Sequence, residues 1–173
     1  MGILNVTPDS FSDGGRFFRP DLAAERGREM EEAGADVIDV GGESTRPGSE
    51  PVSAAEEKRR VIPVIEELVA ESNVPVSVDT QKAEVAEEAL RKGAQIINDV
   101  SGLRNDPDMA ALAAESGAVV CLMHMQGRPR NMQKNPSYDD VVQDIVSWLE
   151  RRLRCAEDNG IERSRIFVDP GFG

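Results

Sequence analysis

The stretch Gly93–Val100, with the sequence GAQIINDV, contains the pattern that decides the fold. A Gly follows a helix-like segment, apolar residues then form a short strand, and the strand closes on polar side chains. Gly suits the left-handed conformation that follows a helix C-terminus. The same order recurs along the chain, and we predict six strands: Ile3–Val6, Asp36–Val40, Val74–Asp79, Gln95–Val100, Val119–His124 and Arg165–Asp169.

The segments between these strands carry helix start signals. Ser53 and Glu56 form a capping box, and Asp106 stands before a Pro at a first helical position. Thr80 and Ser137 are expected to cap the helices that follow them. Apolar residues at helical spacing predict the buried faces of two helices: Val61, Val64, Ile65 and Leu68 in the first, and Val142, Ile145, Leu149 and Leu153, extended by Trp148, in the second.

Strands that alternate with helices predict an α/β fold with a parallel sheet. An open, doubly wound sheet that binds nucleotides would usually show a Gly-rich turn after its first strand, and this sequence has none. Nearly every predicted strand instead carries Asn, Asp or His at its last or next-to-last position, as in a TIM barrel, whose active site is built from strand ends. We therefore predict a TIM (β/α)8 barrel, here incomplete, with about six parallel strands and five helices in one domain, residues 1–173.

Composition excludes several classes of function. The chain has 32 acidic and 20 basic residues and a net charge of -12, which argues against nucleic-acid binding. It contains no apolar run long enough to span a membrane and no secretion signal, so we expect a cytoplasmic protein. Cys121 and Cys155 lack the spacing of a metal site and are expected to be free thiols. A single His excludes a His-rich zinc site.

Two loops combine residues suited to a binding site. Asn5–Gly15 is long, polar and Gly-ended, which indicates a lid with Asn and Asp oxygens near a metal or phosphate; the alternative is a plain surface loop. Gly41–Gly48 combines Gly residues with hydroxyl and Arg side chains, as suits an anion; the alternative is a turn with a solvated Arg.

Three polar residues close three different strands: Asp79, Asn98 and Asp169. Carboxylates that point into a barrel mouth need partners, which a ring rich in N–H donors would supply. The competing interpretation is that each residue caps the following helix. His124 also stands at a strand end, where we expect a pocket wall without a role in proton transfer.

These motifs, in this order, resemble the dihydropteroate synthase family. The matching segments extend over the whole chain: Gly2–Gly15, Asp36–Gly48, Val76–Thr80, Ile97–Val100, Leu122–Met125 and Val168–Gly173. The resemblance implies a pterin-binding barrel that condenses dihydropterin pyrophosphate with p-aminobenzoate to give dihydropteroate in folate biosynthesis. It implies that Asp79, Asn98 and Asp169 bind the pterin ring. Phe11 and Pro47 would form the p-aminobenzoate pocket, where sulfonamides compete.

The resemblance also implies how the reaction is catalysed. Asn5 would lie close to a magnesium ion and the pyrophosphate, Thr45 and Arg46 would lie near the pyrophosphate, and Asp13 would lie near the reacting centre. Breaking the bond from the pterin methylene to the pyrophosphate separates charge, so carboxylates are needed around the pterin and cations around the leaving group.

Compared with the family pattern, the chain lacks the last helix of unit six and two further strand-helix units. Those units carry a Lys and an Arg-x-His site, so we expect either a fragment or a natural short form. The family suggests a homodimer. The alternatives are a methyltetrahydrofolate-type pterin methyltransferase, a non-catalytic pterin-binding remnant, and a half-barrel completed by a partner chain.

Overall fold

In the computed structural model, residues 1–6, 19–43, 51–127, 132 and 135–172 are described. They form six strands, five α-helices and one short 3-10 helix. In chain order the elements are β1 Gly2–Asn5, α1 Pro20–Glu32, β2 Ile38–Gly41, α2 Ala54–Glu71, β3 Val76–Asp79, α3 Ala83–Arg91, β4 Ile96–Asp99, α4 Met109–Ser116, β5 Val119–Met123, α5 Val141–Asp158, η1 Arg163–Arg165 and β6 Ile166–Asp169.

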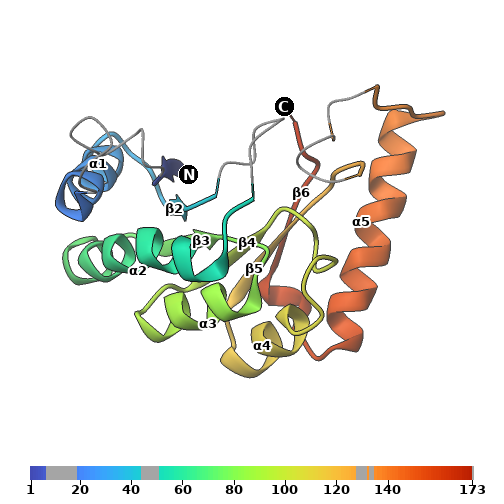
Figure 1. The fold of residues 1–173 in the computed structure, drawn as a ribbon. Helices are drawn as coiled ribbons and strands as arrows, with labels where there is room; N and C mark the ends of the chain where they lie inside the picture. The colour runs from blue at the N-terminus through green and yellow to red at the C-terminus, as the bar shows by residue number, and fades with distance from the viewer. Residues whose placement is uncertain (7–18, 44–50, 128–131, 133–134, 173) are drawn as a thin grey trace.

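The six strands form one parallel sheet in the order β1-β2-β3-β4-β5-β6. Each strand therefore pairs with the next in sequence, as in a TIM barrel, and the helices line one side of the sheet (Figure 1). The predicted α/β class, six strands and five helices are confirmed. Within the described residues the sheet does not close, because β1 and β6 each pair on one side only.

Alternation along the strands divides the sheet into two faces. Leu4, Val40, Val78, Ile97 and Leu122 point towards the helices and are at most 1% exposed. They pack in two clusters against apolar residues of the helices, which include all four predicted core positions of α2. Burial of these side chains provides the main stabilisation of the sheet-helix layers. We call the opposite side, away from the helices, the inner face.

The glycines that precede the strands confirm the repeated pattern. Gly34, Gly93, Gly117 and Gly160 all have positive φ angles, between 73° and 102°. At Gly93 a Cβ would lie 2.6 Å from Val69 Cγ1, so a side chain there would also clash with α2. These positions therefore require the conformational freedom of Gly.

The helix starts were predicted correctly in one case and wrongly in three. Ser53 caps α2, since its Oγ accepts a hydrogen bond from Glu56 N at 3.2 Å. Thr80 is not a helix cap: its Oγ1 accepts from Lys82 N, and Lys82 occupies the N-cap of α3. The cap of α5 is Asp140 rather than Ser137, whose backbone instead pairs with the side chain of Gln126.

The third correction concerns Asp106. The helix after it begins only at Met109, with Asp108 at its N-cap. Asp106 Oδ2 instead accepts a hydrogen bond from Ala83 N at 2.8 Å, at the start of α3. The residue therefore caps a helix, but the helix of the preceding unit, because only the packing of α3 against α4 brings the two together.

The predicted buried face of α5 is only partly correct. Leu149 is buried at 9% exposure, whereas Val142 is 69% exposed and does not belong to the core. Trp148 packs against Gly102, where a Cβ would lie 2.6 Å from the indole ring.

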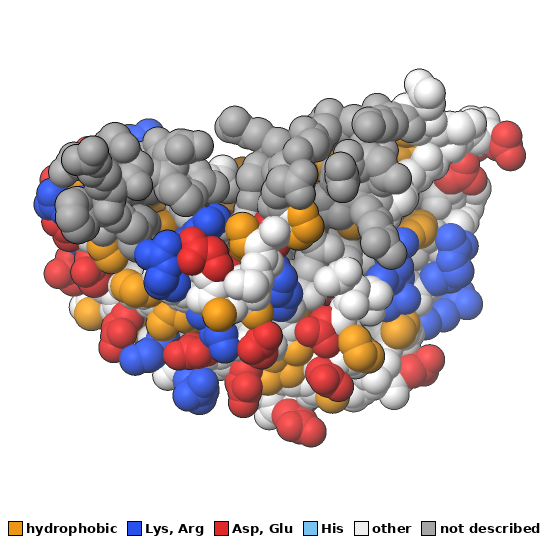
Figure 2. Space-filling view, in the orientation of Figure 1, with side chains coloured by type: hydrophobic (Ala, Val, Ile, Leu, Met, Phe, Trp, Pro, Cys, Tyr) orange, Lys and Arg blue, Asp and Glu red, His pale blue; other side chains and the backbone are white. Residues whose placement is uncertain are grey.

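No helix in the described part of the chain is long and apolar enough to cross a membrane. On the face in Figure 2, acidic and basic side chains are intermixed over the described surface.

Candidate functional site

The C-terminal ends of the strands bring four predicted positions into one layer. Asn5 pairs in register with Gly41, Gly41 with Asp79, and Asp79 with Asn98. A Cβ on Gly41 would lie 3.3 Å from Asp79 Oδ2 and 3.6 Å from Asn5 Oδ1, so both side chains lie on the inner face beside this glycine. The absence of a side chain at Gly41 leaves room between two side-chain oxygens at the C-terminal ends of the strands, which we call the mouth of the sheet.

Asp79 lies in a strongly acidic environment. Burial raises the pKa of its carboxyl well above the usual range, and the negative charges of Asp39, Glu57, Asp99 and Glu43 raise it further. A buried carboxylate that faces like charges is destabilised unless a ligand supplies N–H donors or a cation. The strand ends therefore provide a site for a ring that carries N–H donors or a developing positive charge.

Asn98 is held by an aspartate from a strand two places away. Its Nδ2 donates a hydrogen bond of 2.9 Å to Asp39 Oδ2. Asp39 is 3% exposed, and its Oδ1 has no hydrogen-bond partner among the described residues. Burial raises the pKa of Asp39, while Ser77 and the Asn98 amide act in the opposite direction. The inner face thus contains a buried carboxyl directly below the mouth.

Asp169 lies one layer nearer the mouth, in register with Met123. Its backbone carbonyl accepts a hydrogen bond from His124 N at 2.8 Å, and its Oδ1 accepts one from Gly171 N at 2.7 Å. Gly171 has a φ of +75°, and a Cβ there would lie 2.2 Å from the backbone oxygen of His124. Only Gly fits this turn, so the turn fixes the position of the Asp169 carboxyl.

Between Asp169 and Asn98 lies Cys121, which pairs in register with Asn98 and Phe167. Burial raises the pKa of its thiol to about 12, and the charges of Asp169, Asp39, Asp79 and Asp99 act in the same direction. The thiol is therefore protonated at neutral pH and provides an uncharged wall. Cys121 and Cys155 are both free thiols, as predicted.

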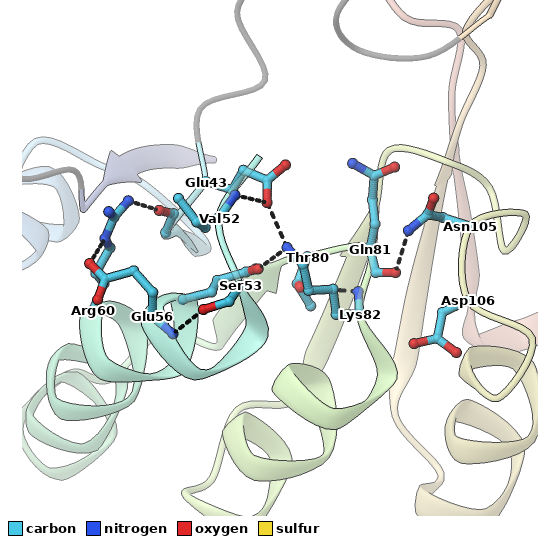
Figure 3. A network of polar contacts seen from close by, with 12 residues as sticks. Glu43, Val52, Ser53, Glu56, Arg60, Thr80, Gln81, Lys82, Asn105 and Asp106 are labelled. Atoms are coloured by element: carbon cyan, nitrogen blue, oxygen red, sulfur yellow. Dashed lines mark hydrogen bonds and ion pairs between the residues drawn. The ribbon is translucent and has the colours of Figure 1, made fainter. Parts of the chain in front are cut away.

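A partly buried ion cluster joins Glu43, just after β2, to α2 and to the start of α3 (Figure 3). Lys82 Nζ donates to Glu43 Oε2 at 2.5 Å and also to Glu57 Oε2. Glu43 Oε2 accepts from Val52 N at 3.3 Å, so the two ends of the intervening segment are joined. Burial lowers the pKa of Lys82, but its bonds to Glu43 and Glu57 outweigh burial and raise the pKa overall.

A second polar contact holds the end of β2. Arg60 Nη1 donates to the Gly42 carbonyl at 2.8 Å, and its Nε donates to Glu56 Oε1 at 2.8 Å (Figure 3). A Cβ on Gly42 would lie 2.7 Å from Val61 Cγ1, so α2 packs directly on the backbone here. Together these contacts fix where the chain leaves β2 for the residues between Glu43 and Val52.

His124 lies at the end of β5 and is 6% exposed. Its ring meets the Trp148 ring edge to face, with the two centroids 5.2 Å apart. The guanidinium carbon of Arg104 lies over the Trp148 ring, 5.2 Å from its centroid. Burial lowers the pKa of His124, and the charge of Arg104 lowers it further. A neutral, aromatic-packed imidazole fits the predicted role of a pocket wall.

The structure brings together the predicted positions Asn5, Asp79 and Asn98 and places Asp169 one layer above them. The predicted residues Phe11, Asp13, Thr45, Arg46 and Pro47 lie outside the described residues. Within the described residues, no three His, Cys, Asp or Glu side chains are grouped so that they would hold a metal ion. The oxygens of Asn5 and Asp79 are nevertheless of the type that magnesium prefers.

Two features of the site were missed from the sequence. Asp39 occurs in a strand of otherwise apolar residues, two residues before Gly41, and the alternation of the strand would have placed it on the inner face. Glu57 stands one helical turn before Val61 and is 1% exposed. In both cases, a charged residue at a position expected to be buried was the available signal.

Comparisons with known proteins identify the family. The family model described as pterin binding enzyme matches residues 1–173. The chain is 50% identical over 173 residues to the dihydropteroate synthase of Bacillus subtilis and covers 58% of that protein. It is also 50% identical to the dihydropteroate synthase of Escherichia coli, of which it covers 61%.

Solved structures show the same fold. Dihydropteroate synthase of Xanthomonas albilineans with 4-aminobenzoic acid superposes with a TM-score of 0.90 at 49% identity, covering 99% of this chain and 60% of that one. A Yersinia pestis dihydropteroate synthase with a sulfonamide drug complex gives a TM-score of 0.91 at 49% identity, covering 99% of this chain and 62% of that one. The chain thus spans about three fifths of the length of these relatives. Because the family model covers the whole chain, this protein belongs to the family of pterin-binding enzymes.

Proposed function

We propose that this chain carries the pterin-binding part of a dihydropteroate synthase, which condenses dihydropterin pyrophosphate with p-aminobenzoate. The observation that carries the proposal is the convergence of Asn5, Asp79 and Asn98 in one layer of strand ends, with Asp169 one layer above. Relatives that are about half identical over the 173 aligned residues are dihydropteroate synthases, and one such structure, from Xanthomonas albilineans, contains 7,8-dihydropteroate.

The acidic environment of Asp79 suits this ligand. A pterin ring presents several N–H donors, which the carboxyls of Asp79 and Asp169 and the amide oxygen of Asn98 accept. When the C–O bond to pyrophosphate breaks, positive charge develops on the pterin, and the nearby carboxylates stabilise it. Ligand binding thus relieves the repulsion between the Asp79 carboxylate and its acidic neighbours.

The second substrate requires little base catalysis. The amine of p-aminobenzoate is neutral at pH 7, so its lone pair is free to attack. Pyrophosphate departs with the electrons of the C–O bond, and the amine forms the new C–N bond to the positively charged methylene carbon. The amine then loses one proton to solvent. We assign Phe11 and Pro47 to the pocket for p-aminobenzoate, Thr45 and Arg46 to the departing pyrophosphate, and Asp13 to the reacting centre.

We propose that Asn5 holds a magnesium ion by its amide oxygen. The side chain is exposed at the end of β1 and lies beside Gly41, across from the Asp79 carboxyl. Magnesium is commonly bound by one or two protein oxygens together with phosphate oxygens and water. Bound there, the ion would neutralise negative charge on the pyrophosphate.

Two further expectations remain predictions. The resemblance to the family suggests a homodimer, and the sequence suggests a cytoplasmic location.

The first test is an assay of the 173-residue chain for dihydropteroate formation, with magnesium and with a chelator. We expect magnesium-dependent product, and we expect Asp79→Asn to reduce its formation at least tenfold. Magnesium titration monitored by Trp148 fluorescence, with and without pyrophosphate, would report the ion independently of turnover, and Asn5→Ala should weaken its binding. A folded chain that binds 7,8-dihydropteroate without forming it would instead be a non-catalytic pterin binder.

A further inference from the structure

The Asp39 carboxyl is buried, and only one of its two oxygens accepts a hydrogen bond from a described residue. It is 3% exposed, its Oδ2 accepts from Asn98 Nδ2 at 2.9 Å, and its Oδ1 has no partner among the described residues. It comes from β2, lies in register with Ser77 of β3, and reaches Asn98 on β4 across the inner face. A buried charge of this kind is costly, so a structural reason for its presence is needed.

The hydrogen bond determines which end of the Asn98 amide faces the mouth. An amide carries a donor end and an acceptor end of nearly equal size. A carboxylate only accepts hydrogen bonds, so it selects the Nδ2 end of Asn98 and leaves Oδ1 for other partners. Without Asp39 both orientations of the amide would be available.

We propose that Asp39 is a positioning residue that holds the Asn98 amide with its oxygen towards the ligand, so that the site selects a ring edge carrying N–H donors. This inference rests on the proposed pterin-binding function. It assigns to Asp39 no contact with the ligand and no proton transfer. Its effect is on specificity, because an amide in the opposite orientation would set its NH2 group against the N–H donors of the ring.

The substitution Asp39→Asn separates this role from simple filling of space. The introduced amide is isosteric with the carboxyl, but its NH2 group can donate to Asn98 Oδ1 and so stabilise the opposite orientation. A ligand donor left without an acceptor in a buried site weakens binding by about tenfold or more. The reciprocal exchange, Asp39→Asn together with Asn98→Asp, restores a donor-acceptor pair and again presents an acceptor at position 98.

The test measures two quantities for the wild type, both single variants, the double variant and the control Asp36→Asn. Asp36→Asn is a matched control because it makes the same change from carboxyl to amide at an exposed position three residues before Asp39. The first quantity is the dissociation constant of 7,8-dihydropteroate by calorimetry. The second is stability by urea unfolding, which monitors the hydrogen bond independently of any ligand.

We expect Asp39→Asn to weaken binding at least tenfold, and Asn98→Asp to lower stability because it sets two buried carboxyls against each other. The double variant should recover most of both losses, and Asp36→Asn should stay within threefold of wild type. Binding by Asp39→Asn within threefold of wild type would overturn the inference and leave the proposed function intact. Coupling of the two positions in stability but not in binding would also overturn it. If the folded wild type does not bind 7,8-dihydropteroate, the proposed function fails, and the inference fails with it.

Discussion

The substitution Asp79→Asn is expected to stabilise the protein while weakening its binding of a pterin. In the free protein the Asp79 carboxyl is destabilised first by burial and then by the charges of Asp39, Glu57, Asp99 and Glu43. The amide has nearly the same shape but no charge. Sites that are adapted to a ligand commonly reduce stability in this way, and removing the unfavourable group increases it.

The expected gain follows from the sign of the pKa shift. The pKa of Asp79 in the folded state lies well above its ordinary value of 3.8. Its unfavourable contribution is therefore absent below the ordinary value and grows as pH rises towards the folded pKa. At pH 8 relief of one uncompensated charge should be worth about 1–2 kcal/mol, which raises the melting temperature of a chain of this length by about 2–8 °C.

Thermal unfolding of wild type and Asp79→Asn at pH 8 and pH 4.5 would measure this effect. The gain should be clearly smaller at pH 4.5, because the unfavourable contribution of the raised pKa shrinks as pH falls towards the ordinary value. Asp36→Asn, at an exposed position before β2, is the matched control and should change stability by less than about 0.5 kcal/mol at either pH. The affinity for 7,8-dihydropteroate should fall at least tenfold. A variant less stable than wild type at pH 8, or an equal gain at both pH values, would refute the reasoning.

Three further substitutions test the packing around the site. Lys82→Met leaves Glu57 buried without its partner and should cost about 3–5 kcal/mol in urea unfolding; a loss below about 1 kcal/mol would show that the ion cluster contributes little to stability. Gly171→Ala should cost more stability than Gly34→Ala, since both have positive φ angles but only Gly171 faces a backbone oxygen at 2.2 Å; equal losses would contradict this. Asp106→Ala should lower the free energy of unfolding by about 1 kcal/mol, because it removes the acceptor for the first N–H of α3. An unchanged unfolding midpoint would count against that cap.

Local physical chemistry made much of the fold predictable from the sequence. Gly at helix ends, short β-branched strands and the Ser53 cap depend on backbone preferences within a few residues. The six strands and their parallel order were therefore recognisable, with strand boundaries that differ from the structure by at most two residues. Polar residues at strand ends likewise indicated Asn5, Asp79, Asn98 and Asp169, because parallel strands place their C-terminal ends at one edge.

Other features depend on contacts between distant segments. Asp106 was expected to cap the helix after it and instead accepts from Ala83, because the packing of α3 and α4 brings an acceptor 23 positions away within 2.8 Å. Val142 has the correct spacing for a buried face and is exposed, because no neighbour covers that end of α5 in the described structure.

The sequence by itself determined the repeating strand-helix order, the parallel sheet and the edge at which its polar residues gather, since these follow from local conformation and alternation. Only the tertiary structure decided how those residues are held. The bond between Asp39 and Asn98 spans 59 positions in the chain, and Lys82 joins Glu43 and Glu57 from two other segments. Such pairings depend on the register of neighbouring strands and the packing of helices on them, which no local pattern records.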